Sequence, residues 1–254
     1  PEGYVAEAFA PWGEPIGVPG HMPAWRPDAS NSAADQAVQM GMHHDGLQFF
    51  PLEGSRRGLL VVNHEYTDDG LLHTTGMLPW TEEKVRKAQA SHGISVIEIV
   101  LEGNAWRVVR PSRYARRITA TTPFALGGPL AGHTLAKTAA DPAGRTVLGT
   151  FANCACGQTP WGTYLAGEEN VQDYFATADT PTAHEKRYGF KRKAWYQWDA
   201  HDPRFDTVRH PNEPNRFGWI VEIDPFDPTS TPVKRTALGR AVHEGAWATL
   251  TKDG

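Results

Sequence analysis

The sequence predicts a mainly β protein built from consecutive antiparallel hairpins. Short apolar segments recur along its 254 residues and are separated by turns, for which the chain supplies 25 Gly and 20 Pro. Only one segment has clear start and stop signals for a helix. Strands do not alternate with helices, and neither GxGxxG nor GxxxxGK[ST] occurs, so a doubly wound nucleotide-binding fold is not expected. This pattern suits a sandwich or an open part of a propeller.

Two hairpins are predicted in the first half of the chain. In the first, LQFFPL (47–52) and RGLLVVNH (57–64) flank a Glu53-Gly54-Ser55 turn. This hairpin presents Asp45 near its entry and Glu65 near its exit. In the second, residues 94–101 and 105–110 alternate on either side of a Gly-containing turn.

The helix is expected at residues 81–92, as an insertion between the hairpins. Thr81 can cap its start, two glutamates favour its first turn, and Gly93 ends it. Because it has few apolar residues, we expect it to lie outside the core. Residues 119–133, which are rich in Pro and Gly, predict a loop.

The central segment, residues 144–170, predicts two strands joined by a polar turn. They cover residues 146–151 and 161–166; the first is followed by two cysteines and the second by two glutamates. A thiol and one or two carboxylates should therefore lie at the same end of neighbouring strands. No Lys or Arg occurs in residues 146–170, so a thiolate beside these carboxylates would require a cation. This is the first indication of a metal centre.

The last third predicts an insertion with some helix at residues 171–202, followed by strands at 216–224, 233–238 and 246–251. Asp253-Gly254 is a hairpin signal with no return strand after it. The chain also begins on Pro1 rather than Met. We therefore expect residues 1–254 to form a single domain that is the N-terminal portion of a longer protein.

Composition and charge exclude several classes. The net charge is −4 and no stripe of Lys and Arg is interleaved with aromatic residues, so nucleic acid is not an expected partner. No run approaches the about 18 apolar residues of a membrane span. The two cysteines are too close in sequence for an ordinary disulfide.

Four residues are candidate metal ligands because each lies at the edge of an apolar strand, next to His, Asn, Cys or Glu: Glu65, Cys154, Glu169 and Glu244. Any single strand-end acid is more often a solvated loop residue. Consecutive strand residues face opposite ways, so only one of Glu168 and Glu169 can accompany Cys154, and the pattern does not decide which.

Other candidates are weaker. A lone cysteine such as Cys154 is most often a small buried hydrophobe, and no nearby Lys or Arg would activate it as a nucleophile. Cys156 could be a second ligand. His64 and His243 should face away from the neighbouring glutamates and support the site or the core. Glu185, with the preceding histidine, is expected at the surface.

Four long motifs resemble those of the PhoX-type alkaline phosphatases: GRTVLGTFANCACGQTPWGTYLAGEEN, NHEYT, HPNEPNRFGWIVEIDPFDP and TPVKRTALGRAVHEGA. The resemblance runs from about Asp45 to the end of the chain. It implies a β-propeller, export by the twin-arginine route to the periplasm or the medium, and hydrolysis of phosphate monoesters. It also implies a cofactor of two ferric ions, Fe(III), with calcium ions, Ca(II). We further expect a monomer.

Carried over by motif, Cys154 would be the thiolate ligand to iron, whereas Glu65, Glu169 and Glu244 would bind iron or calcium. The chain departs from the family pattern in two places: Ala241-Val242 replaces a bulkier pair, and Cys156 stands where a residue without a thiol is expected. Further ligands are expected beyond residue 254, so residues 1–254 alone should be inactive.

Three functions therefore remain open. The first is a phosphomonoesterase that uses iron and calcium. The second is a propeller hydrolase that uses calcium alone on another ester or a lactone. The third is a non-catalytic propeller that binds partners, because a shared scaffold does not establish a shared activity.

Overall fold

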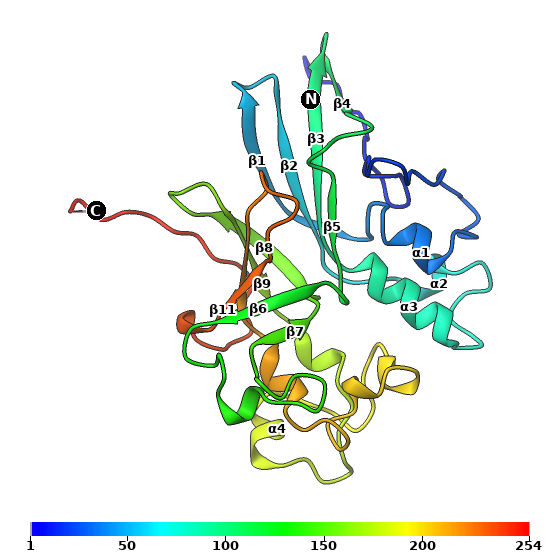
Figure 1. The fold of residues 1–254 in the computed structure, drawn as a ribbon. Helices are drawn as coiled ribbons and strands as arrows, with labels where there is room; N and C mark the ends of the chain where they lie inside the picture. Colours follow the sequence, from blue (N-terminus) through cyan, green and yellow to red (C-terminus); the bar gives the residue numbers. More distant parts are fainter. Residues whose placement is uncertain (1, 254) are drawn as a thin grey trace.

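A computed structural model describes residues 2–253, which form two β-sheets that meet at one side of each (Figure 1). The first sheet has the order β1-β2-β3-β4, with β5 also paired to β3. Its strands are β1 (His44–Glu53), β2 (Arg57–His64), β3 (Gly93–Glu102), β4 (Ala105–Val108) and β5 (Arg116–Ile118). All of its pairs are antiparallel, as the two predicted hairpins require.

The second sheet has the order β7-β6-β11-β10-β9-β8. Its strands are β6 (Pro123–Gly127), β7 (Thr146–Leu148), β8 (Asn153–Gln158), β9 (Tyr164–Glu168), β10 (Ile220–Ile223) and β11 (Val233–Arg235). The β11–β6 pair is parallel, whereas the other pairs are antiparallel. The two sheets confirm the predicted mainly β class. The residues described form no closed barrel, and the propeller remains a prediction.

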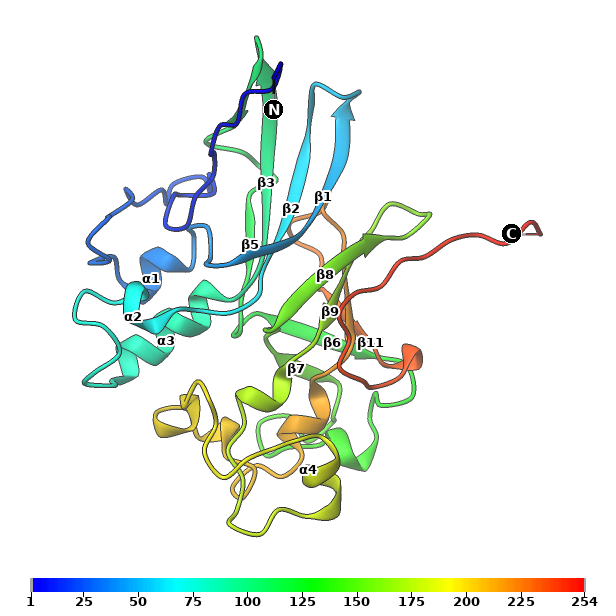
Figure 2. The same ribbon diagram turned by 180° about the vertical axis from the view of Figure 1, so that it is seen from behind.

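The helices are short and lie around the sheets. In Figures 1 and 2, the first three α-helices gather beside one end of the first sheet, and α4 lies beyond the second sheet. Their bounds are α1 (Ala33–Gln36), α2 (Asp69–Leu72), α3 (Glu82–Ser91) and α4 (Ala183–Arg187). The 3₁₀ turns are η1 (Thr134–Ala136), η2 (Val171–Asp173), η3 (Trp198–Ala200), η4 (Pro203–Phe205), η5 (Glu213–Arg216) and η6 (Thr236–Leu238). No helix within residues 2–253 has the length and hydropathy of a membrane-spanning segment.

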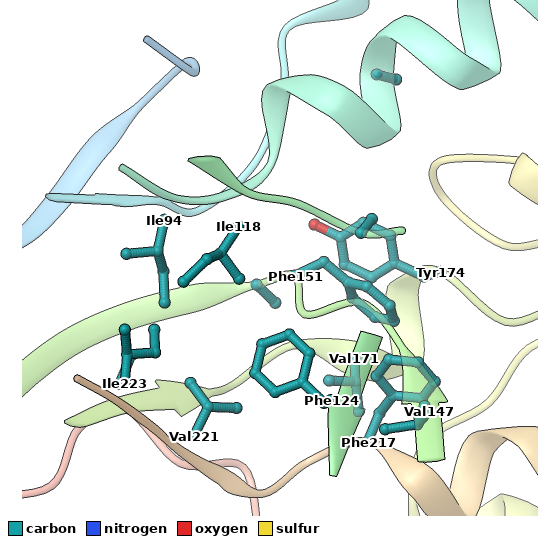
Figure 3. Close-up of a cluster of buried hydrophobic side chains, with 14 of the residues drawn as sticks. Ile94, Ile118, Phe124, Val147, Phe151, Val171, Tyr174, Phe217, Val221 and Ile223 are labelled. Atoms are coloured by element: carbon teal, nitrogen blue, oxygen red, sulfur yellow. The ribbon is translucent and has the colours of Figure 1, made fainter. Parts of the chain in front are cut away.

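One apolar core joins the two sheets. Figure 3 shows Ile94 and Ile118 of the first sheet beside Phe151, with Val221 and Ile223 of the second sheet close by. The ring of Phe151 lies 4.5 Å from that of Tyr174 and 4.5 Å from that of Phe217. Since the aromatic side chains of residues 171–217 fill this core, that segment stabilises the junction between the sheets.

The central hairpin differs from the prediction. β9 pairs with β8, which is the NCACGQ segment that we expected in the turn, and β7 ends at Leu148 and pairs with β6. Strand β7 ends before Gly149 because this residue has a φ of +92° and lies against the backbone of Ala120. Cys154 therefore lies within a strand.

The expected helix forms as α3, with Thr81 accepting a hydrogen bond from the Lys84 amide as its cap. The expectation that this helix lies outside the core is wrong, because Val85 and Ala88 are buried in it. Small and polar residues also pack inward here: the buried Lys87 ammonium donates to the Ala29 carbonyl at 2.7 Å. The small number of apolar residues in this helix was therefore a poor guide to its burial.

Three smaller expectations are also wrong. The loop expected at residues 119–133 contains β6; the strand expected at 216–224 is shortened to β10 by η5; and residues 246–251 form no strand. The segment after η6 lies against β8 and β9 and then extends away from the sheets (Figures 1 and 2). Gly254, the end of the predicted terminal turn, is outside the residues described.

A candidate metal centre between the sheets

Three acidic or thiol side chains from separate parts of the chain meet where β1 crosses β8. Asp45, Glu65 and Cys154 each place one possible ligand atom within 4.8 Å of the others, and all three are half-buried. The Cys154 Sγ lies 3.7 Å from the Asp45 Oδ2. Both sheets therefore contribute to the group, because Asp45 and Glu65 belong to the first hairpin and Cys154 to β8.

Asp45 and Cys154 occupy equivalent irregularities of their strands. The register of β1 shifts between His44 and Leu47, and that of β8 shifts between Asn153 and Cys156. Each shift follows a non-glycine residue with a left-handed backbone, His43 with φ +47° and Ala152 with φ +53°. Such bulges redirect a side chain from the regular alternation and cluster near functional sites.

A buried hydrogen-bond chain holds the backbone of Cys154 against the first sheet. The Tyr164 hydroxyl donates to the Asn63 Oδ1 at 2.8 Å, and the Asn63 side-chain amide donates to the Cys154 carbonyl. Asn63 is fully buried at the end of β2, and Tyr164 begins β9. The position of the thiol thus depends on both sheets.

The two adjacent glutamates have separate roles. Glu168 is fully buried and faces away from the group; it pairs with the Lys234 ammonium at 2.6 Å and accepts from the Thr150 hydroxyl at 2.9 Å. Glu169 follows β9, and its amide donates to the Ala152 carbonyl at 2.9 Å. The charge of Glu169 acts on Glu65 and Cys154, so Glu169 lies on the side of the metal centre.

Glu244, the fourth predicted ligand, is exposed and does not belong to the group of three. Its backbone nevertheless lies against β9: a Cβ built on Gly167 would be 2.6 Å from the Glu244 carbonyl oxygen. The segment of residues 243–247 is therefore close to the strand that leads to Glu169. The prediction that Glu244 is a ligand stays a prediction.

The electrostatics of the group are those of crowded anions. Burial, together with the charges of Asp45 and Glu169, raises the pKa of the Glu65 carboxyl to about 7. Burial and the charge of Asp45 raise the pKa of the Cys154 thiol to about 12. None of the ion pairs formed by Lys or Arg within residues 2–253 involves Asp45, Glu65 or Glu169.

This donor set fits a metal ion better than it fits any metal-free chemistry. A thiol with so high a pKa is not a nucleophile at neutral pH, whereas a bound cation would favour its deprotonated form. Carboxylate oxygens suit hard cations, and a thiolate suits a transition metal. Asp45, Glu65, Cys154 and Glu169 are therefore the side chains that could hold the metal.

The remaining candidates act elsewhere. His64 is fully buried and its Nε2 lies 2.7 Å from the Ser95 Oγ, so it supports the first sheet. The His243 Nε2 bonds to the Gly239 carbonyl at 2.9 Å. Cys156 packs at the edge of the core, and burial raises the pKa of its thiol.

Glu185, expected at the surface, is instead half-buried. Its carboxylate accepts from the Thr177 and Thr207 hydroxyls at 2.5 and 2.6 Å, and its backbone amide is capped by Thr182. It therefore joins α4 to the loops beside it.

Asp45 was expected at the entry of the first hairpin but is not among the four predicted ligands. A signal for it was available, because Asp45 and Glu65 lie at the outer ends of one predicted hairpin. In the structure His44 pairs with His64, which brings the two acids to the same end of the hairpin. The bulge that turns Asp45 toward β8 has no comparable signal in the sequence.

Comparison with known proteins gives a consistent result. The family model described as alkaline phosphatase PhoX matches residues 1–254. The chain is also similar to the solved structure of Pseudomonas fluorescens PhoX in complex with vanadate, a transition state analogue, with 47% identity and a TM-score of 0.95. That match covers 100% of this chain but 44% of the other, so the chain spans less than half the length of that protein. No curated protein matches the chain.

Proposed function

Because the chain belongs to the PhoX family of alkaline phosphatases, we propose that it is part of a metal-dependent enzyme that hydrolyses phosphate monoesters. The observation that carries the proposal is the meeting of Asp45, Glu65 and Cys154 from both sheets, with Glu169 acting on the same groups. Carboxylates alone would repel a phosphate, so their grouping favours a site that works with cations bound.

The proposed cofactor contains two Fe(III) ions and Ca(II). Cys154 would bind iron, while Asp45, Glu65, Glu169 and Glu244 would bind iron or calcium. When bound, the cations would neutralise phosphate oxygens, activate an oxygen nucleophile and orient the ester.

The protein side chains and backbone would position these groups. The two bulges aim Asp45 and Cys154 at one point, and the Tyr164–Asn63 hydrogen bonds hold the Cys154 backbone. The buried Glu168–Lys234 ion pair holds the end of β9 in place, and the next residue, Glu169, lies on the side of the thiol. The geometry is thereby organised before substrate arrives, which lowers the cost of reorganisation during reaction.

The thiol distinguishes this proposal from a hydrolase that uses calcium alone. Calcium takes oxygen ligands, whereas a thiolate is a ligand for transition metals. Cys154 at the centre of the group therefore favours iron in at least one position. The wider proposal is a β-propeller completed by residues outside this chain, exported by the twin-arginine route to the periplasm or the medium, and monomeric.

The test is the metal content, visible spectrum and turnover of p-nitrophenyl phosphate by the full-length protein. We expect iron and calcium, a thiolate-to-iron absorption band, and hydrolysis. Cys154→Ala should lose the band and most of the activity, whereas Cys156→Ala should keep both. A Cys154→Ala protein that stays coloured and active would refute the ligand assignment, and a colourless, iron-free, active wild type would favour calcium alone.

A further inference from the structure

A cavity of about 810 Å³ is lined by residues next in sequence to three of the segments that carry the candidate metal ligands. His43 and Tyr66, which line it, flank Asp45 and Glu65 in sequence, and Asp173 follows Glu169 by one turn. The rings of His43 and Tyr66 stack with their centroids 3.9 Å apart and form one wall. The Tyr174 hydroxyl also donates to the Glu65 carbonyl at 3.4 Å.

The lining of this cavity combines acceptors with flat aromatic surface. Its carboxylates come from Asp68, Asp69 and Asp173. Its exposed rings are those of Trp195, which is 76% exposed, and Tyr66, which is 39% exposed. A volume of this size holds a small organic molecule, and a mostly apolar lining with a few convergent polar groups is typical of ligand sites.

Several polar groups in the cavity wall lack partners. Thr67 is only 6% exposed, and its Oγ1 has no hydrogen-bond partner in the described part of the chain. The Asp69 Oδ1 also has no hydrogen bond there, although it lies 3.5 Å from the His73 Nε2. The Asp173 carboxylate is half-buried, and no hydrogen bond from another residue to it is present among residues 2–253. Buried polar groups normally have partners, so a ligand or water would complete them.

The chemistry of the ligand follows from these groups. Ionised carboxylates only accept hydrogen bonds, so the ligand must donate, as hydroxyl groups do. A purely aromatic group would leave the carboxylates desolvated without partners. A second phosphate would meet three carboxylates against two ammonium groups, those of Lys191 and Lys193. A polyhydroxylated ring meets both demands, because its hydroxyls donate and its C–H face packs on the aromatic rings.

We propose that this cavity binds the alcohol portion of the phosphate ester, and that this portion is a sugar or a similar polyol. The inference rests on the proposed function, since the metal centre would hold the phosphate while the cavity holds the group that leaves with the ester oxygen. Trp195 would pack on the ring of the alcohol, and Asp173 would accept hydrogen bonds from its hydroxyls.

The test compares kcat/KM for glucose 6-phosphate with kcat/KM for phenyl phosphate, using the full-length enzyme with metals. In Trp195→Ala and in Asp173→Asn, the ratio of the two values should fall about tenfold, which is the effect of losing one hydrogen bond to a charged group or its equivalent. Asp179→Asn is the matched control, because this exposed residue of the same segment pairs with Arg192 outside the cavity. Its ratio should stay that of the wild type.

The two possible failures differ in what they affect. An unchanged ratio in both variants, or an equal loss on both esters, would overturn the assignment of the cavity while leaving the phosphatase proposal intact. If the wild type hydrolyses neither ester, the proposed function fails instead. Binding of methyl glucoside, measured by saturation-transfer NMR, then tests whether the cavity is a sugar site. A signal that disappears in Trp195→Ala would support it; no wild-type signal, or an equal signal in the variant, would overturn it.

Discussion

Gly46 lies against the backbone of Cys154 where the two sheets cross. A Cβ on Gly46 would be 2.9 Å from the Cys154 carbonyl oxygen and 2.7 Å from the Cys156 amide nitrogen, both closer than real Cβ contacts. Because these are backbone atoms of a paired strand, neither can move without disturbing β8. The absence of a side chain at Gly46 is therefore what allows the bulge that carries Asp45 to reach the thiol.

The first prediction concerns this contact. Gly46→Ala should push β1 away from β8, weaken binding of metal by the full-length protein and reduce the proposed thiolate-to-iron absorption. Overpacking at such a site costs about 1–3 kcal/mol of stability. Metal content and the visible spectrum measure the first effect, and thermal unfolding of the metal-free protein measures the second.

Gly54→Ala is the matched control for a general loss of stability. Gly54 has a φ of +57° in an open turn, with nothing near its position for a Cβ. The substitution should cost about 1–2 kcal/mol through backbone strain, yet leave metal binding unchanged. Normal colour and metal content in Gly46→Ala would contradict the proposed role of the contact.

The second prediction separates the adjacent glutamates. Glu168→Gln should destabilise the protein by about 3–5 kcal/mol, because it leaves the ammonium of Lys234 buried without its counter-charge. Glu169→Gln should instead lower metal content while leaving the metal-free protein as stable as the wild type or slightly more so, because it removes a charge that opposes Glu65 and Cys154. Denaturant unfolding of the metal-free proteins, with metal analysis of the loaded ones, gives both readouts.

Each glutamate variant serves as the control for the other. The assignment would be wrong if Glu168→Gln lost metal without losing stability, or if Glu169→Gln unfolded as readily as Glu168→Gln.

The third prediction concerns Glu185. Burial alone would raise the pKa of its carboxyl, but hydrogen bonds from Thr177, Thr207 and Thr182 outweigh burial and lower it to about 2. Glu185→Gln should therefore reduce the free energy of unfolding at pH 7 by about 1–2 kcal/mol, since a charged acceptor is replaced by a neutral one. It should leave metal content unchanged, because α4 lies beyond the second sheet (Figure 1).

The pH dependence of that difference follows from the lowered pKa. A carboxyl that binds its proton less readily in the folded state stabilises the protein above pH 4.5, and this contribution is lost as the pH falls toward about 2. The difference between wild type and Glu185→Gln should thus be full at pH 7 and shrink below pH 4.5. Glu102→Gln, at the exposed end of β3, is the control and should leave the free energy of unfolding at pH 7 unchanged. A gap for Glu185→Gln that grows in acid would contradict the interpretation.

Local patterns predicted the two hairpins of the first sheet, β1–β2 and β3–β4, but not its short strand β5. The apolar runs that became β2 and β3, the Gly-containing turn between β3 and β4, and the Thr81 cap of α3 are all determined by neighbouring residues, and each appears where expected. The second sheet was harder to predict. Its β11–β6 pair joins segments more than a hundred residues apart, and NCACGQ has too little apolar alternation to signal β8.

The sequence by itself determined which donor atoms the chain can supply: the thiol of Cys154 and the carboxylates that follow the strands, in motifs that identify the family. Only the tertiary structure decided which of them meet. It placed Glu169 rather than Glu168 beside the thiol, added Asp45 through a bulge, and left Glu244 exposed on a segment lying against Gly167. The physical reason is that a metal site requires atoms within a few ångströms of one another, and that proximity arises from strand register, backbone bulges and the close contact at Gly46, none of which is a property of any single stretch of sequence.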